Sequence, residues 1–254
     1  MNENYINYKI NYGDTLYHIA AMYHTTVEEL MNMNPYINPY NLLVGQIIRI
    51  APSYTDNIPY PRLYSQPQVT MNNSISENEF ELSKKMRMAW DDHVYWDRLA
   101  IISILDGLKD VDSTTSRALR TAKEISDLFR TYYGDNIGDT LNRLLTQHIS
   151  IAGDFIKASK NKDNENIAKL NRDWYDNADK IADELSKINP YYDKETIRKM
   201  MHRHLDLLKE EIANRLAGKY TEDVNSSDQV VQEAMMMADY FVNGIVQQFP
   251  DMFR

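Results

Sequence analysis

Four polar residues stand in or beside the apolar stripes of a long helical region, and together they could do chemistry. They are His93, His148, Asn177 and His204, each near the middle of its segment. Carboxylates that could join them are Asp97, Asp179, Glu211 and Asp239. In an antiparallel bundle, mid-helix positions meet at one level, so three histidines and a carboxylate there would suit Zn²⁺ or Fe²⁺. The sequence thus offers His93, His148 and His204 as metal ligands.

Two other interpretations of these residues stay open. A hydrogen-bonded polar layer would fix the register of the helices, and histidines at stripe edges would simply touch water. The Glu-x-x-His pair of diiron carboxylate bundles is absent. The sequence also lacks a nucleotide-binding glycine loop, GxSxG and HExxH. It therefore favours a protein without enzymatic activity or cofactor, while it leaves an enzyme open.

The first 52 residues predict a small unit in the order strand, helix, helix, strand. "YKINYGDTL" alternates like a short strand, Gly13 permits a turn, and Asp14 or Thr15 can cap the first helix. Thr25 and Thr26 precede a second helix, which "NPYINPYNL" ends. "VGQIIRIAP" then closes the unit as a second strand.

Residues 5–52 also resemble a LysM module over its full length. The matching motifs are "GDTL", "IA" followed by a tyrosine, "TTVEEL", "NP", a leucine before "VGQ", and a closing "IRI-P" strand. The resemblance implies binding to N-acetylglucosamine glycans, chiefly peptidoglycan and chitin. It also implies a groove between two loops, formed by Gly13, Asp14, Thr15 and Leu16 on one side and Asn34, Pro35, Tyr36, Ile37 and Asn38 on the other.

The chemistry of such a groove is reasonable on physical grounds. Backbone groups in two irregular loops are free to bond an acetamido group, and Leu16 and Ile37 can contact its methyl. A shallow site buries little area, so one copy should bind between millimolar and micromolar. Useful affinity then needs several copies acting together. The alternative is that the loops are only turns and the module docks protein.

From residue 76 onward nearly everything predicts helix. We expect five main helices and a shorter helical piece, at about 76–108, 134–160, 163–187, 193–218, 225–248 and 114–131. Helices with apolar stripes must pack on each other, which gives an all-α antiparallel bundle. Residues 53–75 hold three prolines and little periodicity, so they predict a linker between a module over 1–52 and a bundle over 76–254.

The C-terminal part loosely resembles uncharacterised helical domains found beside LysM modules in spore-forming bacteria. The segments that carry this likeness are "HVYWDRLAIISI", "NRDWYDNADKIADEL" and "MADYFVNGIVQQFPDMF". No activity comes with it, only a biological setting.

Composition excludes several classes of partner and site. The net charge is -9 with no basic stripe, which disfavours nucleic acid and anionic membranes. There is no cysteine, so disulfides and thiolate sites are excluded. The first ten residues lack a secretory signal, and the longest apolar run, "LAIISIL", is too short to span a bilayer. We therefore expect synthesis in the cytoplasm without a signal peptide.

Three functions follow, in order of preference. The first is a non-enzymatic peptidoglycan-binding protein of the spore envelope or cell wall, whose bundle supplies homo-oligomerisation or contacts with other envelope proteins. The second is a structural component of a phage-tail-like or other self-assembling particle. The third is a metal-binding bundle or enzyme that the module carries to a glycan.

Overall fold

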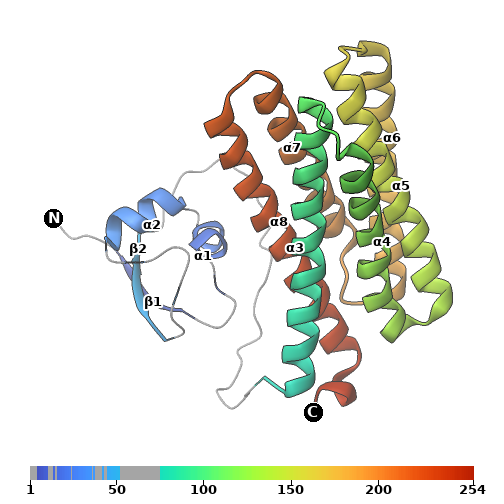
Figure 1. Cartoon of the computed structure of the whole chain (residues 1–254). Helices are drawn as coiled ribbons and strands as arrows, with labels where there is room; N and C mark the ends of the chain where they lie inside the picture. Colours follow the sequence, from blue (N-terminus) through green and yellow to red (C-terminus); the bar gives the residue numbers. More distant parts are fainter. Residues whose placement is uncertain are drawn as a thin grey trace. The chain divides into compact units, whose positions relative to one another are not determined.

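The structure is a computed structural model that describes residues 5–10, 14, 16–23, 25–35, 37, 42, 45–51 and 75–254. The chain separates into two compact units, residues 1–73 and 74–254 (Figure 1), and each is described by itself. Nearly all of the predicted linker 53–75 lies outside the described residues, so its limits stay a prediction.

The N-terminal unit has the predicted order. Strand β1 (Ile6–Lys9) pairs antiparallel with β2 (Ile47–Ile50), with Ile6 opposite Ile50. Between them lie two helices, α1 (Leu16–Met22) and α2 (Val27–Met33). Apolar side chains from α1, α2, β2 and the residue after β1 form one small core: Ile10, Leu16, Ile19, Ala20, Leu30, Ile48 and Ile50. The α+β prediction for this unit is confirmed.

Helix α2 begins where the sequence placed a cap. The Thr26 hydroxyl accepts a hydrogen bond from the Glu29 backbone N–H at 3.1 Å, and the Glu29 carboxylate accepts one from the Thr26 N–H at 3.0 Å. This reciprocal capping box satisfies two backbone donors that a helix start leaves free. It fixes the helix direction so that Leu30 faces the core.

The second unit is the predicted all-α antiparallel bundle. Its helices are α3 (Glu77–Asp106), α4 (Val111–Tyr133), α5 (Asp135–Lys160), α6 (Asn164–Ile188), α7 (Lys194–Leu216) and α8 (Tyr220–Gln248), followed by the 3₁₀ turn η1 (Pro250–Phe253). Each helix packs on the next along the chain, and α8 packs back on α3, so the six helices close a ring (Figure 1). One large apolar core fills it.

Helix α4 is longer than the short piece predicted over 114–131. Its buried face contains several small or hydroxyl-bearing residues, so the apolar stripe is weak in the sequence: Thr114, Ala118, Thr121, Ala122, Ile125, Ser126 and Phe129. Small residues let neighbouring helices approach closely, and packing then extends the helix beyond what the pattern shows. Helix α8 also begins earlier than predicted, at Tyr220 rather than near 225.

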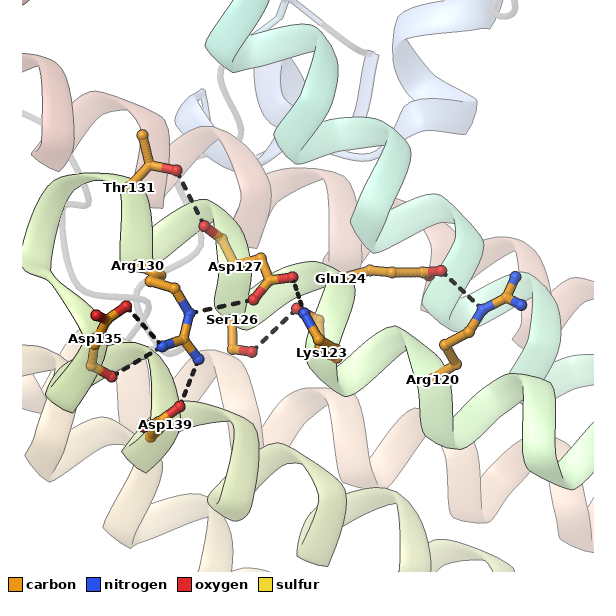
Figure 2. A network of polar contacts seen from close by, with 9 residues as sticks. All are labelled: Arg120, Lys123, Glu124, Ser126, Asp127, Arg130, Thr131, Asp135 and Asp139. Carbon is orange, nitrogen blue, oxygen red and sulfur yellow. Dashed lines mark hydrogen bonds and ion pairs between the residues drawn. The ribbon is translucent and has the colours of Figure 1, made fainter.

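A cluster of ion pairs covers the tight turn between α4 and α5 (Figure 2). The Arg130 guanidinium binds Asp127 on its own helix and Asp135 and Asp139 at the start of α5. The two α5 carboxylates are largely exposed, so water screens these pairs and they contribute little to stability.

Close packing between α8 and the α6–α7 connection leaves no room for a side chain at Gly244. A Cβ there would lie 2.0 Å from the Tyr192 ring, whose hydroxyl donates to the Phe241 carbonyl at 2.6 Å. We expect Gly244→Ala to displace this buried tyrosine and to lower the free energy of unfolding by about 2–3 kcal/mol. Urea denaturation checks the value.

Gly153→Ala is the matched control, because a Cβ at that helical glycine would meet no atom within 4 Å. Alanine favours a helix more than glycine does, so this variant should be as stable as the wild type or slightly more so. Equal losses in the two variants would contradict the packing described here.

Among the residues that the structure describes, no helix combines the length and apolarity that a bilayer crossing requires.

Candidate functional site

The first loop of the predicted groove is described at Asp14 and Leu16. The Asp14 carboxylate accepts a hydrogen bond from the Tyr8 hydroxyl at 2.8 Å, which ties the loop to β1. The Leu16 side chain is only 3% exposed and belongs to the module core. It therefore holds the loop from beneath and does not present its methyl groups to a ligand. Gly13 and Thr15 lie outside the described residues.

The second loop is built around Asn34, which joins the end of α2 to β2. Its amide nitrogen donates to the Leu30 carbonyl at 2.8 Å and to the Arg49 carbonyl at 2.7 Å, and its amide oxygen accepts from the Arg49 N–H at 2.8 Å. The Asn34 carbonyl in turn accepts from the Ile37 N–H at 2.9 Å. The Asn34 side chain thus links the end of α2 to β2, and both its amide nitrogen and its amide oxygen are hydrogen-bonded within the module.

Two further residues of the second loop are described, Pro35 and Ile37. Ile37 is half-buried and packs against the module core, while Pro35 is exposed. The methyl contact predicted for Leu16 and Ile37 together would then fall to Ile37. Tyr36 and Asn38 lie outside the described residues, so the assignment of the groove as a whole stays a prediction.

Comparison with known proteins decides the family of this unit. The family described as LysM domain matches residues 8–51. Residues 8–51 are a LysM domain. The match lies within the range 5–52 predicted from the motifs, and the strand, helix, helix, strand order agrees with it.

Two curated proteins resemble part of the chain. Both are described as outer membrane antigenic lipoprotein B. The protein from Histophilus somni is 33% identical over 66 residues, which is 26% of this chain and 20% of the relative. The protein from Haemophilus influenzae is 36% identical over 63 residues, 25% of this chain and 16% of the relative. The chain thus spans a fifth or less of the length of these relatives. No solved structure matches the chain.

Beyond the LysM domain, the polar residues predicted for the bundle are all buried, but they form two groups instead of one. His148 and Asn177 form the first. Nδ1 of His148 lies 2.8 Å from the Asn177 amide oxygen, and the Trp174 indole N–H donates to Nε2 at 3.2 Å. Because Nε2 accepts, the proton is on Nδ1 and the ring is neutral. Both ring nitrogens are engaged, so His148 sits in a hydrogen-bonded layer and not in the metal-ligand arrangement predicted for it.

His93, Asp97 and His204 form the second group. His93 and Asp97 stand one turn apart on α3, and the His93 and His204 rings are 5.9 Å apart. One ligand atom from each residue lies within 4.8 Å of the others. Burial lowers the pKa of His93 to about 4, raises that of Asp97 to about 8, and holds that of His204 well below its ordinary value. Burial thus disfavours the charged form of each of these three groups.

The other carboxylates predicted to join the layer are engaged elsewhere. Asp239 binds Arg87, and Asp179 lies 2.7 Å from Nε2 of His202. Glu211 accepts from the Arg98 guanidinium at 2.6 Å. Asp97 is therefore the predicted carboxylate that meets the histidines.

A buried charge cluster around Arg98 was not predicted from the sequence. Besides Glu211, Arg98 binds Asp223 of α8, which also pairs with Arg215. Both carboxylates are 1% exposed, and burial raises the pKa of Glu211 to about 7 against the lowering by Arg98. In the sequence "YWDRLA", Arg98 has the pattern of a solvent-exposed residue. Its partly buried position becomes clear only from the packing of α7 and α8, which bring Glu211 and Asp223 to it.

We expect the buried His148 to make the free energy of unfolding depend on pH, and a variant without this histidine isolates its contribution. Burial, the main cause, lowers its folded pKa to about 4, against some raising by Asn177 and further lowering by His93. Between pH 6.5 and 4 the unfolded chain therefore binds a proton that the native state does not. Stability from His148 falls as pH falls through this window, by about 1.4 kcal/mol per pH unit.

We expect His148→Gln to be less stable than the wild type at pH 7 by about 2–3 kcal/mol, because the buried bonds to Trp174 and Asn177 are lost. At pH 5 the difference in the free energy of unfolding between the two proteins should be smaller by about 2 kcal/mol. The wild type loses stability when His148 is protonated in the unfolded chain, and the variant has no histidine at this position. Other buried titrating groups are common to both proteins and cancel in the difference. Urea denaturation at the two pH values checks this, and a constant gap would contradict a neutral His148.

Proposed function

We propose that the chain is a non-enzymatic glycan-binding protein of a bacterial cell wall or spore envelope. The LysM domain at residues 8–51 is the observation that carries this proposal. Its ligand would be an N-acetylglucosamine glycan of the peptidoglycan or chitin type. The curated relatives are named as outer membrane lipoproteins, which is consistent with an envelope setting for this kind of module.

We propose that the LysM domain binds the glycan weakly and that the bundle brings several copies together, because a small module offers little binding energy. The described groove residues Pro35 and Ile37 offer little apolar surface, so a single copy should bind weakly. The bundle buries a large core of its own and would supply the multivalency, through self-association or envelope partners. Such assembly would convert a weak sugar contact into stable attachment.

Co-sedimentation of the full-length chain with insoluble peptidoglycan tests the glycan part. We expect the chain to pellet with the polymer and to be released by soluble β-1,4-linked oligomers of N-acetylglucosamine, with longer oligomers more effective. Glucose oligomers of the same length and linkage are the matched control, because they lack only the acetamido group. A chain that stays in the supernatant, or that both oligomers release equally, would overturn the proposal.

Light scattering coupled to size-exclusion chromatography tests the assembly part separately. We expect a species larger than one chain of 29.7 kDa at micromolar concentration. Retention on peptidoglycan should then fall when the sample is diluted below the association range. A monomer at every concentration, with and without glycan, would contradict self-assembly and leave envelope partners as the source of multivalency.

A further inference from the structure

The second buried group, His93, Asp97 and His204, lies in the bundle, outside the LysM domain, and its hydrogen bonds are incomplete. His204 is 1% exposed, and neither of its ring nitrogens has a hydrogen-bond partner among the residues that the structure describes. An imidazole carries at least one N–H donor, so a wholly unpartnered ring in a core leaves a costly defect. The contrast with His148 is sharp, since both of its nitrogens are bonded within the same bundle.

The protonation state of His93 is fixed from outside the group. The Thr121 hydroxyl donates to the Ala118 carbonyl at 2.7 Å, so its oxygen accepts from Nδ1–H of His93 at 3.2 Å. The lone pair of His93 is therefore on Nε2, which faces the Asp97 carboxylate at 3.5 Å. Metal-binding histidines are held in this way, with the far nitrogen donating to a neighbour and the near one left bare.

Asp97 is buried without a cationic residue beside it among the residues that the structure describes. Its ion-pair partner is His93 on the same helix, at 3.5 Å. The adjacent Arg98 binds Glu211 and Asp223 instead. The group is thus two imidazoles and a carboxyl around one point, with no lysine or arginine of the described residues paired to it.

Room for one more small ligand lies beside Asp97. A cavity of about 20 Å³ is lined by Asp97 and Thr115 among mostly apolar side chains from α3, α4, α5, α6 and α7, and neither His93 nor His204 lines it. This is enough for one water molecule. The Thr115 hydroxyl is buried and has no hydrogen-bond partner among the described residues, so the cavity has a polar end that such a water could meet.

From these observations we propose that Nε2 of His93, the Asp97 carboxylate and one ring nitrogen of His204 bind a single divalent transition-metal ion. Two nitrogens and one oxygen suit Zn²⁺ or Fe²⁺ and leave at least one coordination position for water. The site differs from the set predicted from the sequence, because Asp97 replaces His148. It is independent of the LysM domain and stands whether or not the chain binds glycan.

The full-length chain, made without a histidine tag and stripped with a chelator, tests the proposal. Titration with Zn²⁺ should show one equivalent bound, and Co²⁺ should give visible absorption bands that Zn²⁺ abolishes. At a free Zn²⁺ concentration a hundred times the Kd, the Tm should rise by roughly 5–10 °C. Less than a tenth of an equivalent of either metal would overturn the site.

Variants then decide which residues bind the metal. Asp97→Asn and His204→Gln should each weaken binding more than tenfold, and Thr121→Val should weaken it by about 10–100-fold although no ligand is lost. His202→Ala is the control, because His202 lies two residues from His204 but is partly exposed and faces Asp179. It should bind as the wild type does.

His148→Gln separates this ligand set from the one with three histidines, and it should keep one equivalent. A loss in His148→Gln as large as in His204→Gln would overturn the assignment, as would wild-type binding in Asp97→Asn and His204→Gln. Circular dichroism of each stripped variant shows whether it folds. For a variant that does not fold, the cobalt spectrum of the wild type decides, since nitrogen coordination must appear in it.

Discussion

Arg98→Ala is expected to lower the free energy of unfolding of the bundle by about 3–5 kcal/mol. The guanidinium links α3 to Glu211 on α7 and Asp223 on α8, and both carboxylates are 1% exposed. Removing one partner of a buried ion pair leaves charge without solvation, which costs far more than the pair itself contributes. Asp223 keeps its contact with Arg215, so most of the loss should come from Glu211. Urea denaturation followed by circular dichroism measures it.

Arg130→Ala is the matched control for this prediction. Arg130 also binds carboxylates, at Asp127, Asp135 and Asp139 (Figure 2), but their side chains are 40%, 87% and 72% exposed. Water can solvate them when the arginine is lost, so the effect should be a small fraction of that of Arg98→Ala. A second variant, Glu211→Gln with Arg98 retained, removes the buried charge and keeps an acceptor, so it should be milder than Arg98→Ala. Similar losses in Arg98→Ala and Arg130→Ala would contradict the account.

Asn34→Ala is expected to abolish most glycan binding, although the Asn34 side chain need not touch glycan. Its amide makes three hydrogen bonds, one to the Leu30 carbonyl of α2 and two to the Arg49 backbone of β2, and their loss should cost about 2–3 kcal/mol. A module of under 50 residues has only a few kcal/mol of stability. The variant should therefore be largely unfolded in its LysM domain, and retention on insoluble peptidoglycan should fall about tenfold or more.

Asn32→Ala controls for this loss, because Asn32 is an exposed asparagine two positions earlier on the same helix. The Asn32→Ala variant should bind peptidoglycan as the wild type does, and its LysM domain should stay folded. Amide spectra of the full chain separate folding from contact, since Asn34→Ala should lose dispersed signals of residues 5–51 while the bundle signals stay. Full binding by a folded Asn34→Ala variant would show that the hydrogen bonds of the Asn34 side chain are not required.

Local signals made the LysM domain predictable. The Thr26 cap, the alternation in the second strand and the helical spacing of Leu16, Ile19 and Ala20 each act within a few residues, and each appears in the structure. The helices of the bundle were predictable for the same reason. Helix α4 was underestimated because its core face depends on small residues such as Ala118 and Ala122, which carry little pattern.

The meeting of side chains across helices could not be read from the sequence. His93 and Asp97 are four residues apart on one helix, so their contact follows from helical geometry. The approach of His204 to His93, and of His148 to Trp174, depends on the rotation and axial shift of separate helices. The same holds for Arg98, whose partners are 113 and 125 residues away in the chain. The residue types in the sequence indicate the candidate site residues, but the packing of the helices determines which of these side chains are in contact.

Nuclear magnetic resonance on the full-length chain tests the proposal that the LysM domain binds an N-acetylglucosamine glycan. Amide signals would be followed while a tetramer of β-1,4-linked N-acetylglucosamine is added. We expect saturable shifts concentrated in residues 13–16 and 34–38, with a Kd between about 1 μM and 1 mM, and unmoved signals from 77–248. An absence of shifts at several times this concentration, or shifts confined to the bundle, would overturn the proposal.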